Sequence, residues 1–289
     1  MVQRRRTQRQ ATTEVTKMGR LIRTYLPFAS NELKSQLAYR GAFYIWALIS
    51  MFGAFVSYFL WMAIYGSSES GVIGNLTQNE MVVYIFMVYV TSSIVCIDIS
   101  TWIGYDVVEG RVAMNLIKPI DYRTSLISEA LGNMIYRILV PGVFVWIGLE
   151  VYKVFVLDMP ILSLPTLLLY ILSSLLSFLI FVLFDFCFGM VAFFTTYIFG
   201  LRMAKTALLS FLTGQLIPIS LFPLAIQKVF DFLPFSSMIY TPVMVYLGKY
   251  TGTKLAWVLG RQLFWVIVLY IIGSFIWKKV TKRLVVLGG

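Results

Sequence analysis

The stretch EGRVAMNLIKPIDY, residues 109–122, lies between two long apolar runs and combines charged residues, a glycine and a proline. Its apolar residues Val112, Leu116 and Ile120 recur at every fourth position, and Pro119 falls near its end. This spacing predicts a short amphipathic helix that the proline stops. A connection between two membrane spans needs only a plain loop, so a patterned helix at this place indicates a docking element.

The composition of the whole chain is that of a membrane protein. Of its 289 residues, 59% are hydrophobic and only 13% are charged, whereas soluble domains carry roughly 25% charged residues. Several apolar runs reach about 20 residues, the length that crosses a bilayer as a helix. We therefore predict an all-α integral membrane protein with six transmembrane helices, over residues 41–64, 82–105, 125–148, 164–198, 204–222 and 258–277.

Basic residues predict the orientation of these spans, because loops rich in Lys and Arg stay in the cytoplasm. Residues 1–40 hold nine Lys or Arg, the loop 65–80 holds none, and the stretch 106–124 holds Arg111, Lys118 and Arg123. We predict a multi-pass protein of the plasma membrane, with both termini and the stretch 109–122 in the cytoplasm. The net charge of +11 reflects this bias, so we expect no nucleic-acid partner.

The N-terminal part of the chain divides in two. Residues 1–16 are basic and polar, which predicts a disordered cytoplasmic tail. Over residues 17–40, apolar side chains recur at spacings of three or four, which predicts an amphipathic helix in the membrane interface that Pro27 kinks or splits. A soluble helix packed on a partner is the alternative. The transmembrane domain follows over residues 41–289.

Prolines interrupt the chain between the fifth and sixth predicted spans. Two apolar pieces of about ten residues, divided at Leu233–Phe235, are too short to cross a bilayer. We therefore predict an extracellular re-entrant helical hairpin over about residues 220–248. It is marked by Pro218, Pro223, Pro234 and Phe235.

Three charged residues lie within predicted spans, namely Asp98, Arg137 and Asp185. Burying a charge in a membrane costs free energy, so such residues usually have a role in function or in helix packing. Asp98 and Arg137 lie in consecutive antiparallel spans, and we predict that they pair and fix helix packing. A proton or substrate relay and snorkelling towards water are the alternatives.

The chain lacks recognisable catalytic chemistry. It has no histidine, no glycine-rich loop of the kind that cradles ATP phosphates, and no catalytic constellation of side chains. We predict no catalytic residue, no cofactor and no metal site on this chain, and expect that it is not itself an enzyme.

Two motifs carry a resemblance that covers nearly the whole chain. Both resemble segments of the type-2 permease family of ABC exporters. EGRVAMNLIKPIDY looks like the E-G-x-x-x-x-x-L-x-x-P segment of that family. GQLIPISLFP (214–223) followed by LPF (233–235) looks like its G-x-x-I-P-x-x-x-F-P … L-P-F segment. The chain resembles the membrane subunit of such an exporter.

This resemblance implies that about residues 107–121 form a coupling helix that inserts into a cleft of a cytoplasmic ATPase subunit. The implied partners are two such ATPase subunits, which would hold ATP and Mg²⁺, a second permease copy or a paralogous permease, and the lipid bilayer. The implied function is the export of a hydrophobic or amphipathic substrate, such as a drug, a peptide or a lipid-like molecule, from a bacterial cell. The coupling residues would be Glu109, Gly110, Arg111, Val112, Leu116, Ile117, Lys118 and Pro119.

Two other functions remain open on the sequence. An ion-gradient-driven secondary transporter would need charged groups near the midplane and two matching broken helices, and only one proline-broken region is evident. A non-transporting membrane immunity or scaffold protein is the second alternative.

Overall fold

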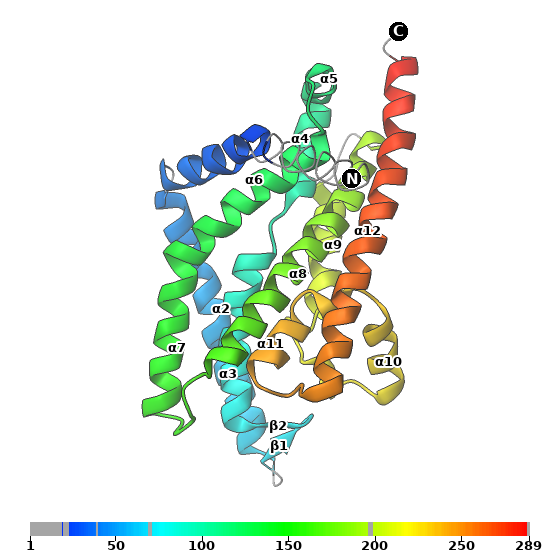
Figure 1. Cartoon of the computed structure of the whole chain (residues 1–289). Coiled ribbons are helices and arrows are strands. Elements are labelled where there is room, and N and C mark those ends of the chain that lie inside the picture. Colours follow the sequence, from blue (N-terminus) through cyan, green and yellow to red (C-terminus); the bar gives the residue numbers. More distant parts are fainter. Residues whose placement is uncertain (1–18, 20–22, 39, 69–70, 196–198, 288–289) are drawn as a thin grey trace, which may run out of the picture.

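The computed structural model of the protein describes residues 19, 23–38, 40–68, 71–195 and 199–287. The long helices run side by side and form an elongated bundle (Figure 1). We call one end the α5 end, after the short helix α5 (Arg111–Ile117) that lies there. We call the other the β-hairpin end, where strands β1 (Val72–Ile73) and β2 (Leu76–Thr77) pair antiparallel.

Within the described residues, four helical segments are long and apolar enough to cross a membrane. They correspond to the second, third, fourth and sixth predicted spans, and they are Gln78–Val108, Tyr122–Phe155, Leu164–Phe193 and Gly252–Lys282. The first predicted span, 41–64, lies within α2 (Arg40–Gly66). The structure therefore confirms an all-helical membrane architecture, while six crossings remain a prediction.

The fifth predicted span, 204–222, is wrong in its extent, because α9 (Phe199–Leu212) ends inside it. Beyond α9 the backbone turns at Gly214, whose φ of 78° lies in the left-handed region that favours glycine. The carbonyl of Gly214 accepts a hydrogen bond of 2.5 Å from the buried Tyr84 hydroxyl. Pro218 then starts a short 3-10 turn, Ile219–Leu221. Contacts inside the bundle thus hold an irregular segment where the apolar pattern predicts helix.

The second and third predicted spans are both interrupted, which the apolar pattern does not predict. The second consists of α3 (Gln78–Val95) and α4 (Ile99–Val108), with a non-helical break between them. The third begins as α6 and continues as α7 after one π-helical turn that contains Pro141. Proline has no N–H to donate to the preceding turn, so a local change of helix type accommodates it. The bounds of these three segments are Tyr122–Arg137, Ile138–Gly142 and Val143–Phe155.

The helices α8 (Leu164–Gly189) and α12 (Gly252–Leu287) pack against each other. A 3-10 turn, Met190–Phe193, follows α8. Gln262 of α12, which is fully buried, donates hydrogen bonds of 2.9 Å to Ser177 Oγ and 3.2 Å to the Ser173 carbonyl, both on α8. A polar side chain buried in this way costs little only when its hydrogen bonds are satisfied, as they are here.

The segment between α9 and α12 contains the two short helices that the proline pattern predicts. They are α10 (Leu224–Phe232) and α11 (Tyr240–Tyr246), and the 3-10 turn Phe235–Ser237 separates them. Both lie at the β-hairpin end of the bundle (Figure 1). The division at residues 233–235 is confirmed. Re-entry into a membrane stays a prediction.

A helix is present over residues 23–38, within the range predicted for the interfacial helix, and its position at a membrane interface stays a prediction. The predicted tail 1–16 lies outside the described residues. The prediction that Pro27 splits this helix is wrong, because contacts hold both of its sides. On one side Tyr25 Oη accepts a hydrogen bond of 2.8 Å from the Asp121 amide. On the other the backbone of Ala29 lies directly against Gly132 of α6, where a Cβ atom would come within 2.1 Å of the Ala29 carbonyl oxygen.

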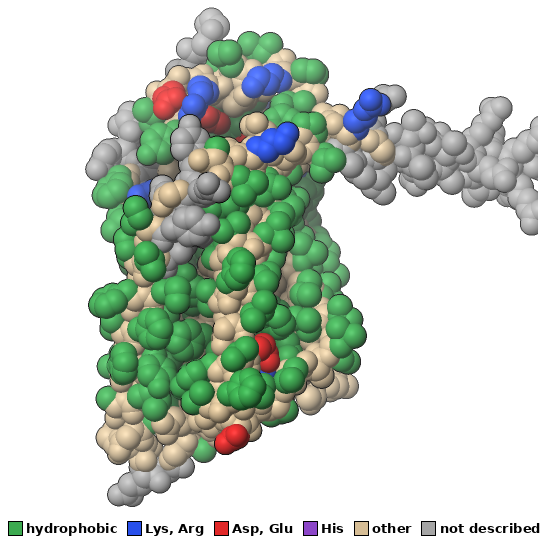
Figure 2. Space-filling view, turned by 90° about the vertical axis from the view of Figure 1, so that its left-hand side faces the viewer, with side chains coloured by type: hydrophobic (Ala, Val, Ile, Leu, Met, Phe, Trp, Pro, Cys, Tyr) green, Lys and Arg blue, Asp and Glu red, His purple; other side chains and the backbone are tan. Residues whose placement is uncertain are grey.

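The core lies around α3, most of whose side chains are buried, and around the facing half of α8. Large apolar side chains point outward on the flanks, as with Phe52 of α2, Phe144 of α7 and Phe275 of α12. Figure 2 shows hydrophobic side chains over most of one flank, with Lys and Arg gathered towards the α5 end. An apolar flank of this extent is what contact with lipid requires.

Candidate functional site

Helix α5 begins and ends where the sequence requires. It starts after Gly110, whose φ of 71° is left-handed and favours glycine. It ends at Lys118, which is extended (ψ 141°) because the following Pro119 disfavours helical backbone before it. The Lys118 ammonium donates a 2.8 Å hydrogen bond to the Asn115 side chain. The short helix predicted within residues 109–122 is therefore present.

A carboxylate that the sequence analysis did not single out, Asp106 of α4, holds α5 in place. It forms an ion pair with Arg111 at 3.0 Å and accepts a 2.8 Å hydrogen bond from the Tyr122 hydroxyl of α6. Arg111 also pairs with Glu109 at 3.2 Å. Asp106 thus joins three consecutive helices, although it lies in an apolar run with no local motif to mark its role.

The apolar residues of α5 do not share one environment. Val112 is buried in its own chain, Leu116 is 39% exposed, and Ile117 is 85% exposed. Met114, which the sequence analysis did not single out, is also exposed. Val112 therefore fixes α5 to the bundle, and the outward apolar surface consists of Met114, Leu116 and Ile117.

The break between α3 and α4 lies inside a predicted membrane span, and charged side chains cover both helix ends. Arg137 of α6 donates hydrogen bonds of 3.1 Å to the Ser93 carbonyl and 3.4 Å to the Cys96 carbonyl, at the C-terminal end of α3. Asp98 caps the N-terminal end of α4 by accepting from the Thr101 amide at 3.3 Å. Each charge opposes the partial charge of its helix end, and the exposed backbone groups gain partners.

Asp98 also belongs to a buried charge cluster, which we define as Asp98, Asp185 and Lys205. The Lys205 ammonium lies 3.0 Å from Asp98 Oδ1 and 2.5 Å from Asp185 Oδ1, and donates to Ser100 Oγ at 2.7 Å. The second oxygen of Asp185 accepts a 2.7 Å hydrogen bond from the Ser100 amide. The cluster fixes α4 to α8 and α9. The side chains of Asp185 and Lys205 are 0% and 3% exposed, whereas that of Asp98 is 39% exposed.

The prediction that Asp98 pairs with Arg137 is wrong, because Asp98 pairs with Lys205. Arg137 instead donates from Nε to Asn133 at 2.7 Å and turns its NH1 towards the end of α3. Lys205 lies at the start of the fifth predicted span, and no local motif marks it as the partner of a carboxylate. Only the folded chain brings it beside two carboxylates that lie 107 and 20 residues away.

A second buried charge pair lies towards the β-hairpin end, on α7. Lys153 forms an ion pair of 2.8 Å with Glu150, and the Tyr246 hydroxyl of α11 donates to the same carboxylate. Lys153 is buried, although the sequence analysis placed it in a loop. These contacts fix α11, one of the two short helices, to the bundle.

The prolines that mark the predicted hairpin each precede a short helical segment. Pro218, Pro223 and Pro234 stand directly before Ile219–Leu221, α10 and Phe235–Ser237. Phe235 packs edge-on against Phe184 of α8, with ring centroids 5.5 Å apart. A proline at the start of a helix loses no backbone bond, so these positions cost little.

Comparison with known proteins identifies the family. The sequence model of the family described as ABC-2 family transporter protein matches residues 51–288, which is most of the chain. No curated protein and no solved structure matches. The matched region contains α5, the buried charge cluster and the two short helices. The chain belongs to the ABC-2 transporter family and is a membrane-embedded permease of an ABC transporter.

Proposed function

We propose that this chain is the permease subunit of an ATP-driven exporter in a bacterial plasma membrane. It would pair with a second copy or a paralogous permease and bind two cytoplasmic ATPase subunits, which would carry ATP and Mg²⁺. The substrate would be a hydrophobic or amphipathic molecule, such as a drug, a peptide or a lipid-like compound, that leaves along the interface between the permeases.

The observation that carries this proposal is the apolar surface of α5. Met114 and Ile117 are 67% and 85% exposed at the tip of the bundle. Charged residues lie at the start of the same helix, where Arg111 forms ion pairs with both Asp106 and Glu109. An exposed apolar centre with a charged rim is the usual anatomy of a protein–protein interface, and its charges can set the register of docking.

The way α5 is held supports a role in transmitting movement. Its buried residue Val112 and the Asp106–Arg111 ion pair connect it to α4, and the Tyr122 hydroxyl connects Asp106 to α6. A partner that displaced α5 would therefore displace the ends of two membrane-crossing segments together.

The finer architecture belongs to the same proposal. Six crossings would place both termini and α5 in the cytoplasm, and α10 and α11 would form the extracellular re-entrant hairpin. The concentration of Lys and Arg towards the α5 end supports this orientation, because positive charge favours the cytoplasmic side (Figure 2).

Co-purification of the ATPase with single-residue variants tests the proposal. Ile117→Asp would place a carboxylate in the apolar contact, which costs about 3–5 kcal/mol when the charge stays unpaired and weakens binding at least about 100-fold. Ile161→Asp is the matched control, because Ile161 is 73% exposed in the loop between α7 and α8, away from α5. Ile117→Asp should lose the ATPase and transport, and Ile161→Asp should keep both. Full association and transport with Ile117→Asp would make α5 an ordinary connection.

A second candidate function, ion-gradient-driven transport, is favoured by the break between α3 and α4. Secondary transporters bind ions at broken helices near charged side chains, and the buried charge cluster adjoins this break. Reconstitution into vesicles separates the two functions. Our proposal requires transport to depend on the ATPase and ATP, whereas transport by this chain alone under an ion gradient would favour the alternative.

A further inference from the structure

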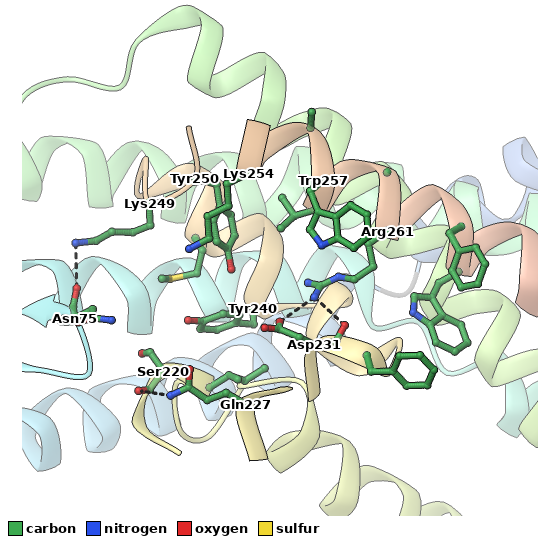
Figure 3. A pocket seen from close by; sticks show the side chains of 18 residues that line it. Asn75, Ser220, Gln227, Asp231, Tyr240, Lys249, Tyr250, Lys254, Trp257 and Arg261 are labelled. Atoms are coloured by element: carbon green, nitrogen blue, oxygen red, sulfur yellow. Dashed lines mark hydrogen bonds and ion pairs between the residues drawn. The ribbon is translucent and has the colours of Figure 1, made fainter. Parts of the chain in front are cut away.

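A cavity of about 810 Å³ opens between α12, α10 and α11, towards the β-hairpin end (Figure 3). This volume lies within the range of small-molecule sites, roughly 300–1,000 Å³. None of the transport features described above uses it. Its walls combine basic and aromatic side chains.

One wall is a single face of α12. Lys254, Trp257, Arg261 and Phe264 all line the cavity and follow one another at spacings of three, four and three residues, which places them in one row along a helix. Trp265 continues the same wall. Lys254 lies near the start of α12, and Trp265 lies about 16 Å further along it, towards the middle of the bundle. Basic and aromatic residues alternate along the row, and its last two members, Phe264 and Trp265, are both aromatic.

Charge in the cavity is unbalanced. Three cations line it, and two of them have carboxylate partners: Lys249 pairs with Glu80 at 2.6 Å and Arg261 pairs with Asp231 at 2.8 Å. Lys254 is the third, and among the described residues no carboxylate pairs with it. Its ammonium lies 5.2 Å from the centroid of the Tyr250 ring. The cavity thus presents one uncompensated positive charge.

Arg261 is the most buried of the three cations. Its side chain is 10% exposed, and its NH1 and NH2 groups donate to Asp231 and Thr241. Its Nε atom is buried and has no hydrogen-bond partner among the described residues. Arg261 therefore contributes to the cavity wall a positive charge that Asp231 balances.

We propose that this cavity binds an amphipathic molecule with an anionic head group. The head group lies between Lys254 and Arg261, beside Trp257, and the apolar part lies along Phe264 and Trp265. Figure 3 shows Lys254, Trp257 and Arg261 on one side of the cavity, with Tyr240 and Asp231 across from them. A membrane lipid and an exported amphiphile share this chemistry. The inference goes beyond the export proposal, because binding is a property of this chain alone.

Native mass spectrometry of the purified full chain tests the site. The probes are dioleoyl phosphatidylglycerol, which is anionic, and dioleoyl phosphatidylcholine, which has the same acyl chains without net charge. We expect one phosphatidylglycerol to bind more tightly than phosphatidylcholine. Equal affinity for the two lipids would overturn the proposal.

Three variants locate the binding. Lys254→Gln should weaken phosphatidylglycerol binding about fivefold, the effect of one lysine near an anionic head group. Lys228→Gln is the control, because Lys228 is an exposed lysine on α10 that does not line the cavity. Gly260→Leu should weaken binding by narrowing the cavity that Gly260 lines, and the variant should fold, since a Cβ atom at Gly260 meets nothing within 4 Å. Equal losses in Lys254→Gln and Lys228→Gln, or normal binding by Gly260→Leu, would overturn the assignment.

Inorganic phosphate separates recognition of an amphiphile from recognition of an anion alone. Millimolar phosphate should not displace phosphatidylglycerol, because phosphate cannot use the aromatic wall. Displacement by phosphate would show that the cavity recognises the anion only, and the proposal would be wrong.

Discussion

Replacing Lys205 with methionine should destabilise the protein more than any surface change. Met fills a similar volume but leaves two carboxylates without their cation. Asp185 is 0% exposed and loses a 2.5 Å contact with the ammonium, while the Ser100 amide still donates a hydrogen bond to it. The side chain of Asp98 is 39% exposed and keeps its bonds to Ser100 and Thr101.

The magnitude follows from this difference in exposure. Removing the partner of a part-exposed charge such as Asp98 lowers the free energy of unfolding by about 0–1 kcal/mol. Removing the partner of a fully buried charge such as Asp185 lowers it by about 3–5 kcal/mol. We therefore expect Lys205→Met to lower the free energy of unfolding by about 3–5 kcal/mol, nearly all of it from Asp185. The double variant Lys205→Met/Asp185→Asn should recover about 2 kcal/mol, because Asn is neutral and still accepts from the Ser100 amide.

The measurement is the free energy of unfolding of the purified chain in mixed micelles, titrated with sodium dodecyl sulfate. Lys228→Met serves as the control, since Lys228 is exposed on α10 and its loss should change stability by less than about 0.5 kcal/mol. The reasoning fails if Lys205→Met is as stable as the parent chain. It also fails if the double variant is no more stable than the single one, because the cost would then not come from an unpaired Asp185.

Two further predictions concern helix packing and nucleotide binding. Gly132→Ala should lower stability by about 1–3 kcal/mol, because its Cβ atom would lie 2.1 Å from the Ala29 carbonyl oxygen. Thermal unfolding should show this loss, and Gly148→Ala, where nothing lies within 4 Å of the new atom, should show none. The purified chain alone should neither bind nor hydrolyse ATP, because its sequence has no phosphate-cradling loop. Saturable nucleotide binding to the lone chain in calorimetry would contradict this.

The features that could be predicted from the sequence are those that local residues decide. Gly110 and Pro119 delimit α5 through their own backbone preferences, and the prolines at 218, 223 and 234 divide the segment before α12 in the same way. Neither effect depends on distant parts of the chain. The family could be recognised for the same reason, since both motifs lie in these segments.

The features that could not be predicted depend on contacts between distant residues. The break between α3 and α4 has no proline or glycine to mark it, and it is stabilised by Arg137 and Lys205 from other helices. Periodicity likewise predicts that Val112 and Leu116 share a stripe but cannot say which part of it the chain itself covers. The structure buries Val112 and leaves Leu116 part-exposed.

The break at residues 96–98 has a mechanical consequence for α4. The backbone ladder of α3 ends before it, so α4 can act as a lever that turns about a joint in the membrane. A helix of ten residues is about 15 Å long, so a tilt of about 10° would move its far end, where α5 begins, by about 2.6 Å. The buried charge cluster connects the start of α4 to α8 and α9, through Ser100 and Asp98. A displacement of α5 would therefore be transmitted through α4 to α8 and α9.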